Sequence, residues 1–107
     1  AFMKVLIGES DFNKYVECSE KPVAIKFYAD WCGPCRITGK FIEELESEYA
    51  GKINFFSVNV DSSPELSGRF QIASLPTIII VKNGQEKDRL VGGVSKVNIQ
   101  DWINKNI

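Results

Sequence analysis

The stretch "AIKFYADWCGPCRI", residues 24–37, joins an apolar run to two cysteines that are separated by two residues. The run "PVAIKFYA", residues 22–29, is too continuously apolar for a half-exposed strand, so we expect a central strand covered on both faces. After Cys32 a helical pattern continues through about Tyr49, and its apolar positions are Ile37, Phe41, Ile42 and Leu45. The cysteines therefore lie where a buried strand gives way to a helix, a context typical of a redox motif.

The flanking sequence predicts the other elements of a mixed sheet. We expect strands at 3–8 and 52–60, and a β-hairpin over 77–93 around Asn83-Gly84. A helix is predicted over 10–18 with Ser10 as its cap, another over 62–72 with Ser63 as cap and Pro64 first, and a third after Ser95. The early strands require parallel crossovers and the hairpin requires an antiparallel pair, which predicts an α/β fold with a mixed sheet between helices.

The composition predicts one domain, residues 1–107, and narrows the classes of function. The chain has 107 residues, 44% of them hydrophobic, which is enough for one core. A net charge of −1 without any cluster of like charges argues against binding to nucleic acid or to a membrane surface. Three cysteines are too few for a secreted disulfide framework, and no signal peptide or membrane span is evident, so we expect a cytoplasmic protein.

The position of the two thiols predicts different roles for them. Cys32 lies at or just before a helix N-terminus, where unpaired N–H groups stabilise a thiolate by up to about 2 kcal/mol. We therefore expect Cys32 to attack a partner's disulfide and Cys35, three residues further along the helix, to resolve the mixed disulfide. Pro34 limits the freedom of the loop between them, and Gly33 keeps that loop accessible.

Two alternatives compete with the redox interpretation of the cysteine pair. The thiols could be two small buried residues that happen to lie together. They could also bind zinc, but a structural zinc site needs four ligands, and the chain has no histidine and only Cys18 besides the pair. We therefore expect no metal and no cofactor, and for Cys18, at the end of the first helix, we expect a half-buried thiol.

Over essentially its whole length the sequence resembles the thioredoxin family. "WCGPC" at 31–35 matches that family's active-site signature, "LPT" at 75–77 its cis-proline loop, "KNG" at 82–84 its last turn, and "VGG" at 91–93 its glycine patch. The resemblance implies a thioredoxin fold, with a central five-stranded mixed sheet flanked by four helices. It also implies a monomeric protein-disulfide reductase that acts on disulfide-containing protein substrates and is recharged by thioredoxin reductase.

The resemblance also implies roles for individual residues. Cys32 corresponds to the family's nucleophile and Cys35 to its resolving thiol, and the Leu75–Pro76 bond is expected to be cis, with the Leu75 backbone free to pair with a substrate strand. Asp61 corresponds to a position near the active-site tryptophan, where it either caps a turn or orients the indole. The expected docking surface consists of Trp31, Gly33, Pro34, Leu75, Pro76, Gly92 and Gly93.

Lys26 departs from the family pattern, because thioredoxins usually have a buried aspartate there, behind the resolving cysteine. The neighbouring lysine of the family is Ser57 here, and Lys40 replaces a proline that kinks the helix, so that Gly39 is left to bend it. Three interpretations of Lys26 are open. Its amine could reach water past the core, it could remain charged and stabilise the Cys32 thiolate, or it could lose its proton through burial and act as the base for Cys35.

Two other functions stay open at this point. An oxidase or isomerase would use the same fold with a less reducing couple. A binding module would use the fold as a clamp, with incidental thiols.

Overall fold

The computed structural model describes residues 3–107 and contains a five-stranded sheet with strand order β1-β3-β2-β4-β5. The parallel part consists of β1 (Lys4–Val5), β3 (Asn54–Asn59) and β2 (Val23–Tyr28). The remaining strands, β4 (Thr77–Lys82) and β5 (Gln85–Val91), are antiparallel to their neighbours. The sheet is therefore mixed, and the apolar run of the sequence forms its central strand, as predicted.

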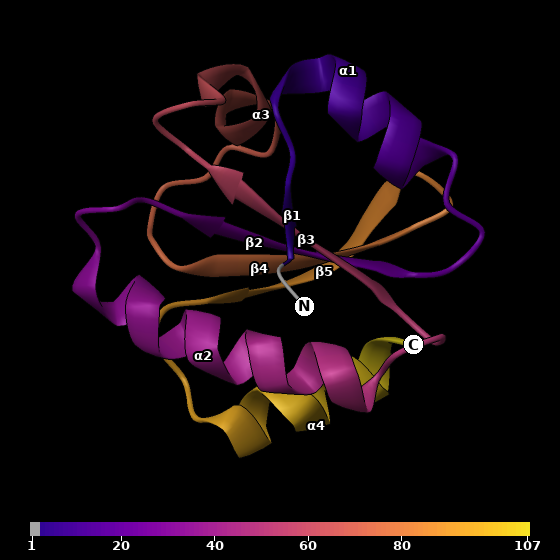
Figure 1. The fold of residues 1–107 in the computed structure, drawn as a ribbon, viewed down its shortest axis with the longest axis vertical. Helices are drawn as coiled ribbons and strands as arrows, with labels where there is room; N and C mark the ends of the chain where they lie inside the picture. Colours follow the sequence, from indigo (N-terminus) through magenta and orange to yellow (C-terminus); the bar gives the residue numbers. More distant parts are fainter. Residues whose placement is uncertain (1–2) are drawn as a thin grey trace.

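Helices cover both faces of this sheet (Figure 1). On one face lie α1 (Gly8–Phe12), which continues as the π-helical segment η1 (Asn13–Glu17), and α3 (Pro64–Arg69). On the other face lie α2 (Gly33–Glu48) and α4 (Lys96–Asn106). With α1 and η1 counted as one rod, the sheet is flanked by four helices, as expected. None of the helices within residues 3–107 has the length and apolarity to cross a membrane.

The central strand β2 alternates between two apolar cores. Val23, Ile25 and Phe27 are buried in the core beneath α1 and α3. Ala24 belongs to the core beneath α2 and α4. Because side chains along a strand alternate in direction, Lys26 and Tyr28 lie on the same face as Ala24, the face covered by α2. The one cation of the strand therefore points toward the helix that carries the cysteines.

Several local predictions are confirmed. Asn83 and Gly84 have φ values of 53° and 78°, the left-handed conformation that a two-residue hairpin turn requires. Ser95 caps α4, and its Oγ accepts a hydrogen bond from the N–H of Asn98 at 3.2 Å. Pro64 is the first residue of α3, where its missing N–H costs nothing.

Other local predictions are wrong. Ser10 does not cap the first helix, because that helix already begins at Gly8, and the N–H of Ile7 donates instead to the Asp11 carboxylate at 2.8 Å. Ser63 precedes α3 as predicted, but its side chain makes no cap hydrogen bond; its Oγ accepts from the N–H of Gly8 at 3.2 Å. Cys18 is exposed rather than half-buried, since Val16 fills the inner face at the end of η1.

The Ile37 side chain, expected in the core, is 61% exposed because it lies at the outer edge of the apolar stripe of α2.

Asp88 on β5 fastens the C-terminal helix to the sheet. Its Oδ2 accepts hydrogen bonds from the Trp102 indole at 2.9 Å and from the Asn106 amide at 3.2 Å. The backbone N–H of Arg89, followed by the Trp102 indole, lowers the pKa of Asp88. A carboxylate with a lowered pKa stabilises the fold above its unfolded-state pKa, and this contribution is lost as the pH falls through the folded-state value.

We expect Asp88→Ala to lower the free energy of unfolding at pH 7 by about 1–2 kcal/mol, because two donors lose a charged acceptor. The difference from the unchanged protein should be smaller at about pH 3 than at pH 7, because this contribution is lost as the pH falls below the ordinary aspartate pKa of about 3.9 and through the lower folded-state pKa. Urea unfolding of both proteins at the two pH values measures the difference in the free energy of unfolding and its dependence on pH. Asp101→Ala removes an exposed carboxylate of α4, the helix that Asp88 contacts, and as the control it should change stability by less than about 0.5 kcal/mol.

Candidate functional site

The two cysteines lie at the junction of β2 and α2. Cys32 is the residue that precedes α2, in extended conformation, and its sulfur accepts a hydrogen bond from the backbone N–H of Cys35 at 3.3 Å. The two Cα atoms are 5.3 Å apart and the two sulfurs are within bonding distance, so the pair forms a disulfide. Pro34 lies in the first turn of α2, where no N–H is needed. The "WCGPC" stretch thus forms a helix start whose free N–H groups face the first sulfur.

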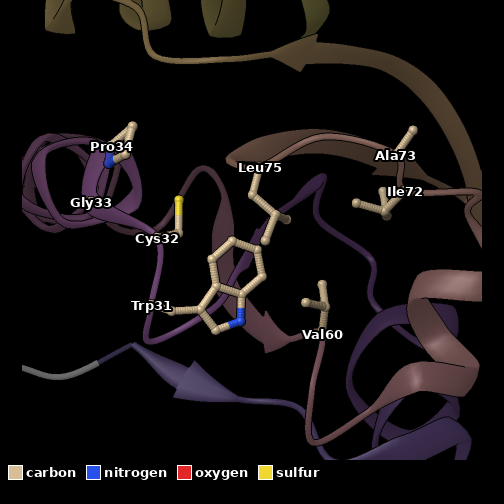
Figure 2. Close-up of a pocket in the computed structure, with 8 residues that line it drawn as sticks. All are labelled: Trp31, Cys32, Gly33, Pro34, Val60, Ile72, Ala73 and Leu75. Atoms are coloured by element: carbon tan, nitrogen blue, oxygen red, sulfur yellow. The ribbon is translucent and has the colours of Figure 1, made fainter.

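An open apolar hollow lies beside Cys32 (Figure 2). The Trp31 side chain is 72% exposed, and Figure 2 shows its indole between Cys32 and Val60 with Leu75 facing it. Its Nε1 donates a hydrogen bond to Asp61 Oδ2 at 2.9 Å. Asp61 also takes part in a turn, since its own N–H donates to Asn59 Oδ1 at 2.9 Å. Asp61 therefore makes one contact that could orient the indole and another that belongs to a turn, as the two interpretations of this residue require.

The other predicted docking residues lie around the same helix start. The Leu75–Pro76 peptide bond is cis, as the resemblance implied. The N–H of Gly92 donates to the Pro76 carbonyl at 2.8 Å, and Gly92 has a φ of 90°, which favours glycine. A Cβ built on Gly93 would lie 3.9 Å from the Cβ of Pro34, which places this glycine against the active-site turn. Residues from three distant parts of the chain thus meet beside the disulfide.

Sequence reasoning missed three residues that also line this hollow: Val60, Ile72 and Ala73. The sequence assigns Val60 to the end of a strand and Ile72 to the end of a helix, whereas in the structure all three residues lie in the irregular segments that follow β3 and α3. Val91, just before the glycine pair, is another exposed apolar side chain, with 51% of its surface accessible. Only the folded arrangement shows that Val60, Ile72 and Ala73 line one hollow with Cys32.

Lys26 lies behind the disulfide, on the face of β2 covered by α2. In the sheet it pairs with Ser57 of β3 on one side and with Ile78 of β4 on the other. Its Nζ is 4.8 Å from the centre of the Tyr28 ring, and burial lowers the pKa of Lys26 while Glu43 partly restores it. The side chain is half-buried and lines a second hollow together with Cys35. The ammonium therefore lies in the part of the structure that adjoins the resolving thiol.

Comparisons with known proteins agree with this geometry. The Thioredoxin family model matches residues 3–105. Thioredoxin from Rickettsia felis is 40% identical over 101 residues, covering 94% of this chain and 96% of that protein. Thioredoxin M-type, chloroplastic, from pea (Pisum sativum) is 40% identical over 102 residues, covering 95% of this chain but only 59% of the pea protein.

Among solved structures, the X-ray structure of Fasciola hepatica thioredoxin superposes with a TM-score of 0.90 at 29% identity, covering 98% of this chain and 100% of that one. The fold, the Cys-Gly-Pro-Cys pair at the helix start and these relatives agree. The chain belongs to the thioredoxin family, and Cys32 and Cys35 are the redox-active pair of a thiol–disulfide oxidoreductase.

Proposed function

We propose that the chain reduces disulfide bonds in protein substrates, with Cys32 as the attacking thiol and Cys35 as the resolving thiol. The observation that carries this assignment is the different position of the two sulfurs. Cys32 lines the open apolar hollow and accepts the N–H of Cys35, whereas Cys35 lies within the first turn of α2. A thiolate at Cys32 is therefore stabilised by the helix N-terminus and faces an incoming substrate.

The exchange proceeds in two displacements. The Cys32 thiolate attacks one sulfur of the substrate disulfide, and the other substrate sulfur leaves as a thiolate that takes a proton from water. Cys35 then loses its proton and attacks Cys32, which breaks the mixed disulfide and releases the second substrate thiol. The substrate gains two electrons, and the protein is left with the Cys32–Cys35 disulfide.

The substrate docks, in this proposal, as an extended segment across the apolar surface around Cys32. The backbone of Leu75 pairs with it as a neighbouring strand would. Asp61 and Lys26 modulate the site, the first by orienting the Trp31 indole and the second from behind the disulfide. The surface itself is formed by Trp31, Gly33, Pro34, Leu75, Pro76, Gly92 and Gly93.

The partners follow from the chemistry. Each turnover leaves a disulfide, so a separate reductase, which we propose to be a thioredoxin reductase, must return two electrons. We further propose a monomeric, single-domain protein of the cytoplasm that carries electrons between that reductase and its substrates. The pea relative is described as chloroplastic, so fractionation of cells into organelles and cytosol tests the location.

The reduction potential of the Cys32–Cys35 couple tests the direction of the reaction. A reductase of this kind should equilibrate with glutathione or dithiothreitol buffers at about −270 mV. A value near −180 mV or higher would instead indicate an isomerase or oxidase. A binding module is tested separately, since it would keep its whole function after both cysteines are replaced by serine.

Alkylation of the reduced protein should label Cys32 before Cys35. At about pH 6 an ordinary thiol is almost entirely protonated, whereas a thiol at a helix N-terminus is partly ionised. The measurement is iodoacetamide labelling followed by peptide mass spectrometry, in a Cys18→Ser background because Cys18 is exposed. Faster labelling of Cys35 would reverse the proposed roles of the two thiols.

A further inference from the structure

The two sulfurs of the disulfide adjoin different hollows. Cys32 lines the apolar hollow of Figure 2, between the helix start and Leu75. Cys35 lines a second hollow, between β2 and α2, with a volume of about 500 Å³. The ionisable residues around this second hollow are Lys26, Tyr28, Asp30, Arg36, Lys40 and Glu43. The hollow beside Cys35 is therefore lined by charged side chains of both signs, with the cations in excess, whereas none of the charged side chains in residues 3–107 lines the hollow beside Cys32.

The Lys26 ammonium occupies a space that Gly39 leaves open. A Cβ built on Gly39 would lie 3.1 Å from Lys26 Nζ, closer than a side-chain carbon normally approaches. Gly39 lies four residues after Cys35 in α2, and residues at this spacing share one face of a helix. The ammonium thus lies beneath α2 one helical turn from the resolving thiol, and the Tyr28 ring at 4.8 Å borders it from the strand side.

The two thiols also differ in what would stabilise their ionised forms. Cys32 precedes α2 and its sulfur accepts the Cys35 N–H. Cys35 lies inside the first turn and is about as buried as Cys32, with 4% against 5% exposed, but its sulfur accepts no hydrogen bond from any group in residues 3–107. A thiolate in such a buried position is unfavourable unless a positive charge lies nearby. Among residues 3–107, the only ammonium that both lines this hollow and lies beneath the helix is that of Lys26.

We propose that Lys26, accommodated by Gly39, is a positioning residue for the resolving step, whose ammonium stabilises the thiolate of Cys35 rather than that of Cys32. This inference rests on the proposed roles of the two thiols. In the resolving step the Cys35 proton leaves to water in the second hollow, the Cys35 sulfur bonds to Cys32, and the substrate sulfur departs with the electron pair of the broken bond. Lys26 gives up no proton and forms no bond.

The other charged residues around the hollow affect whether the Lys26 amine stays protonated. Asp30 and Glu43 favour the protonated amine, while Arg36 and Lys40 oppose it. Burial lowers the pKa of Lys26 and Glu43 raises it, but no salt bridge to Lys26 is formed within residues 3–107. A thiolate at Cys35 would supply a negative charge close to the Lys26 ammonium, which has no salt-bridge partner in residues 3–107. Formation of that thiolate would in turn help to keep the amine protonated.

The test titrates Cys35 as the only thiol, in a Cys18→Ser/Cys32→Ser protein. Its reaction with 5,5′-dithiobis(2-nitrobenzoate) is followed by release of the coloured thiol at pH values from 5 to 10. Lys26→Met keeps the length of the side chain and removes the charge, so the Cys35 inflection should move about one pH unit upward. Because a thiolate of higher pKa is more nucleophilic, the two rate profiles should cross. The Lys26→Met protein should react about threefold more slowly below the inflections and about threefold faster above them.

Two further variants serve as controls. Lys40→Met tests whether any cation near the hollow has the same effect as Lys26, and Gly39→Ala tests whether the position of the Lys26 ammonium matters. Lys40→Met removes an exposed cation from the same hollow and should move the inflection by less than a third as much. Gly39→Ala, which suits a helix better, should displace the ammonium and move the inflection upward by a smaller amount than Lys26→Met. Equal shifts for Lys40→Met and Lys26→Met would overturn the proposal, as would an unchanged inflection in Lys26→Met. Slower reaction at every pH would also overturn it, because that result indicates lost packing or a lost base.

These outcomes do not depend on whether the proposed reductase activity is correct. That activity is measured on the intact dithiol with a protein disulfide. If it fails while the Cys35 inflection still shifts, the function is wrong and the electrostatic role of Lys26 stands.

Discussion

Cys32→Ser is expected to lower the rate of protein-disulfide reduction at least about 10³-fold, to the rate measured without protein. A serine hydroxyl is not ionised near neutral pH, so the N–H of Cys35 and the helix N-terminus have no thiolate to stabilise. The substrate surface around Trp31 and Leu75 is left in place. The loss should therefore appear in kcat, with binding of a disulfide substrate retained.

Two matched variants give this result its meaning. Cys18→Ser replaces the exposed cysteine at the end of η1 and should leave the rate unchanged. Cys35→Ser should still attack but fail to resolve, so a mixed disulfide between Cys32 and the substrate should accumulate and be visible by mass spectrometry. If Cys32→Ser accumulates the mixed disulfide instead, Cys35 is the attacking thiol and the proposed mechanism is reversed.

The parts of the fold that the sequence predicts well are those with a local physical cause. Asn83-Gly84 takes the left-handed conformation of a hairpin turn because few other dipeptides tolerate it, and Ser95 caps a helix through contacts only three residues away. The central strand follows from its unbroken apolar run. Ser10 shows the limit of such reasoning, because several residues near a helix start can cap it, and here the Asp11 carboxylate binds the free N–H instead.

The site is predictable to the extent that it lies within one short motif. Residues 31–35 alone predict the helix start and the cysteine pair, and the family resemblance predicts the cis bond before Pro76. The second hollow does not follow, because it depends on the packing of α2 over β2, which brings Gly39 against Lys26. From the sequence alone, a Lys26 that stays charged is expected to stabilise the thiolate of Cys32, whereas we propose that it stabilises the thiolate of Cys35. The choice of Cys35 comes from which sulfur lines which hollow.

Leu45→Ala is expected to lower the free energy of unfolding by about 2–5 kcal/mol. Leu45 is fully buried on the inner face of α2, within the core that also includes Ile42, Tyr49 and Ile103. The substitution removes buried methyl groups and leaves a cavity that neighbouring strands and helices cannot fill. For a domain with a total stability of about 5–15 kcal/mol this is a large share, and the melting temperature should fall by roughly 10–20 °C. Urea unfolding gives the free energy directly, provided that the slope of the transition is unchanged.

Ile37→Ala is the control from the same helix, and it tests the structure against the sequence pattern. The apolar spacing of α2 placed Ile37 and Leu45 on one inner face, yet Ile37 is 61% exposed and Leu45 is 0% exposed. Alanine also has the higher helix propensity, so stability should stay within about 0.5 kcal/mol of the unchanged protein or rise slightly. A loss for Ile37→Ala as large as that for Leu45→Ala would mean that α2 is rotated about its axis relative to the structure. Such a rotation would also move Gly39 away from Lys26, because Gly39 and Leu45 lie on the inner side of the same helix.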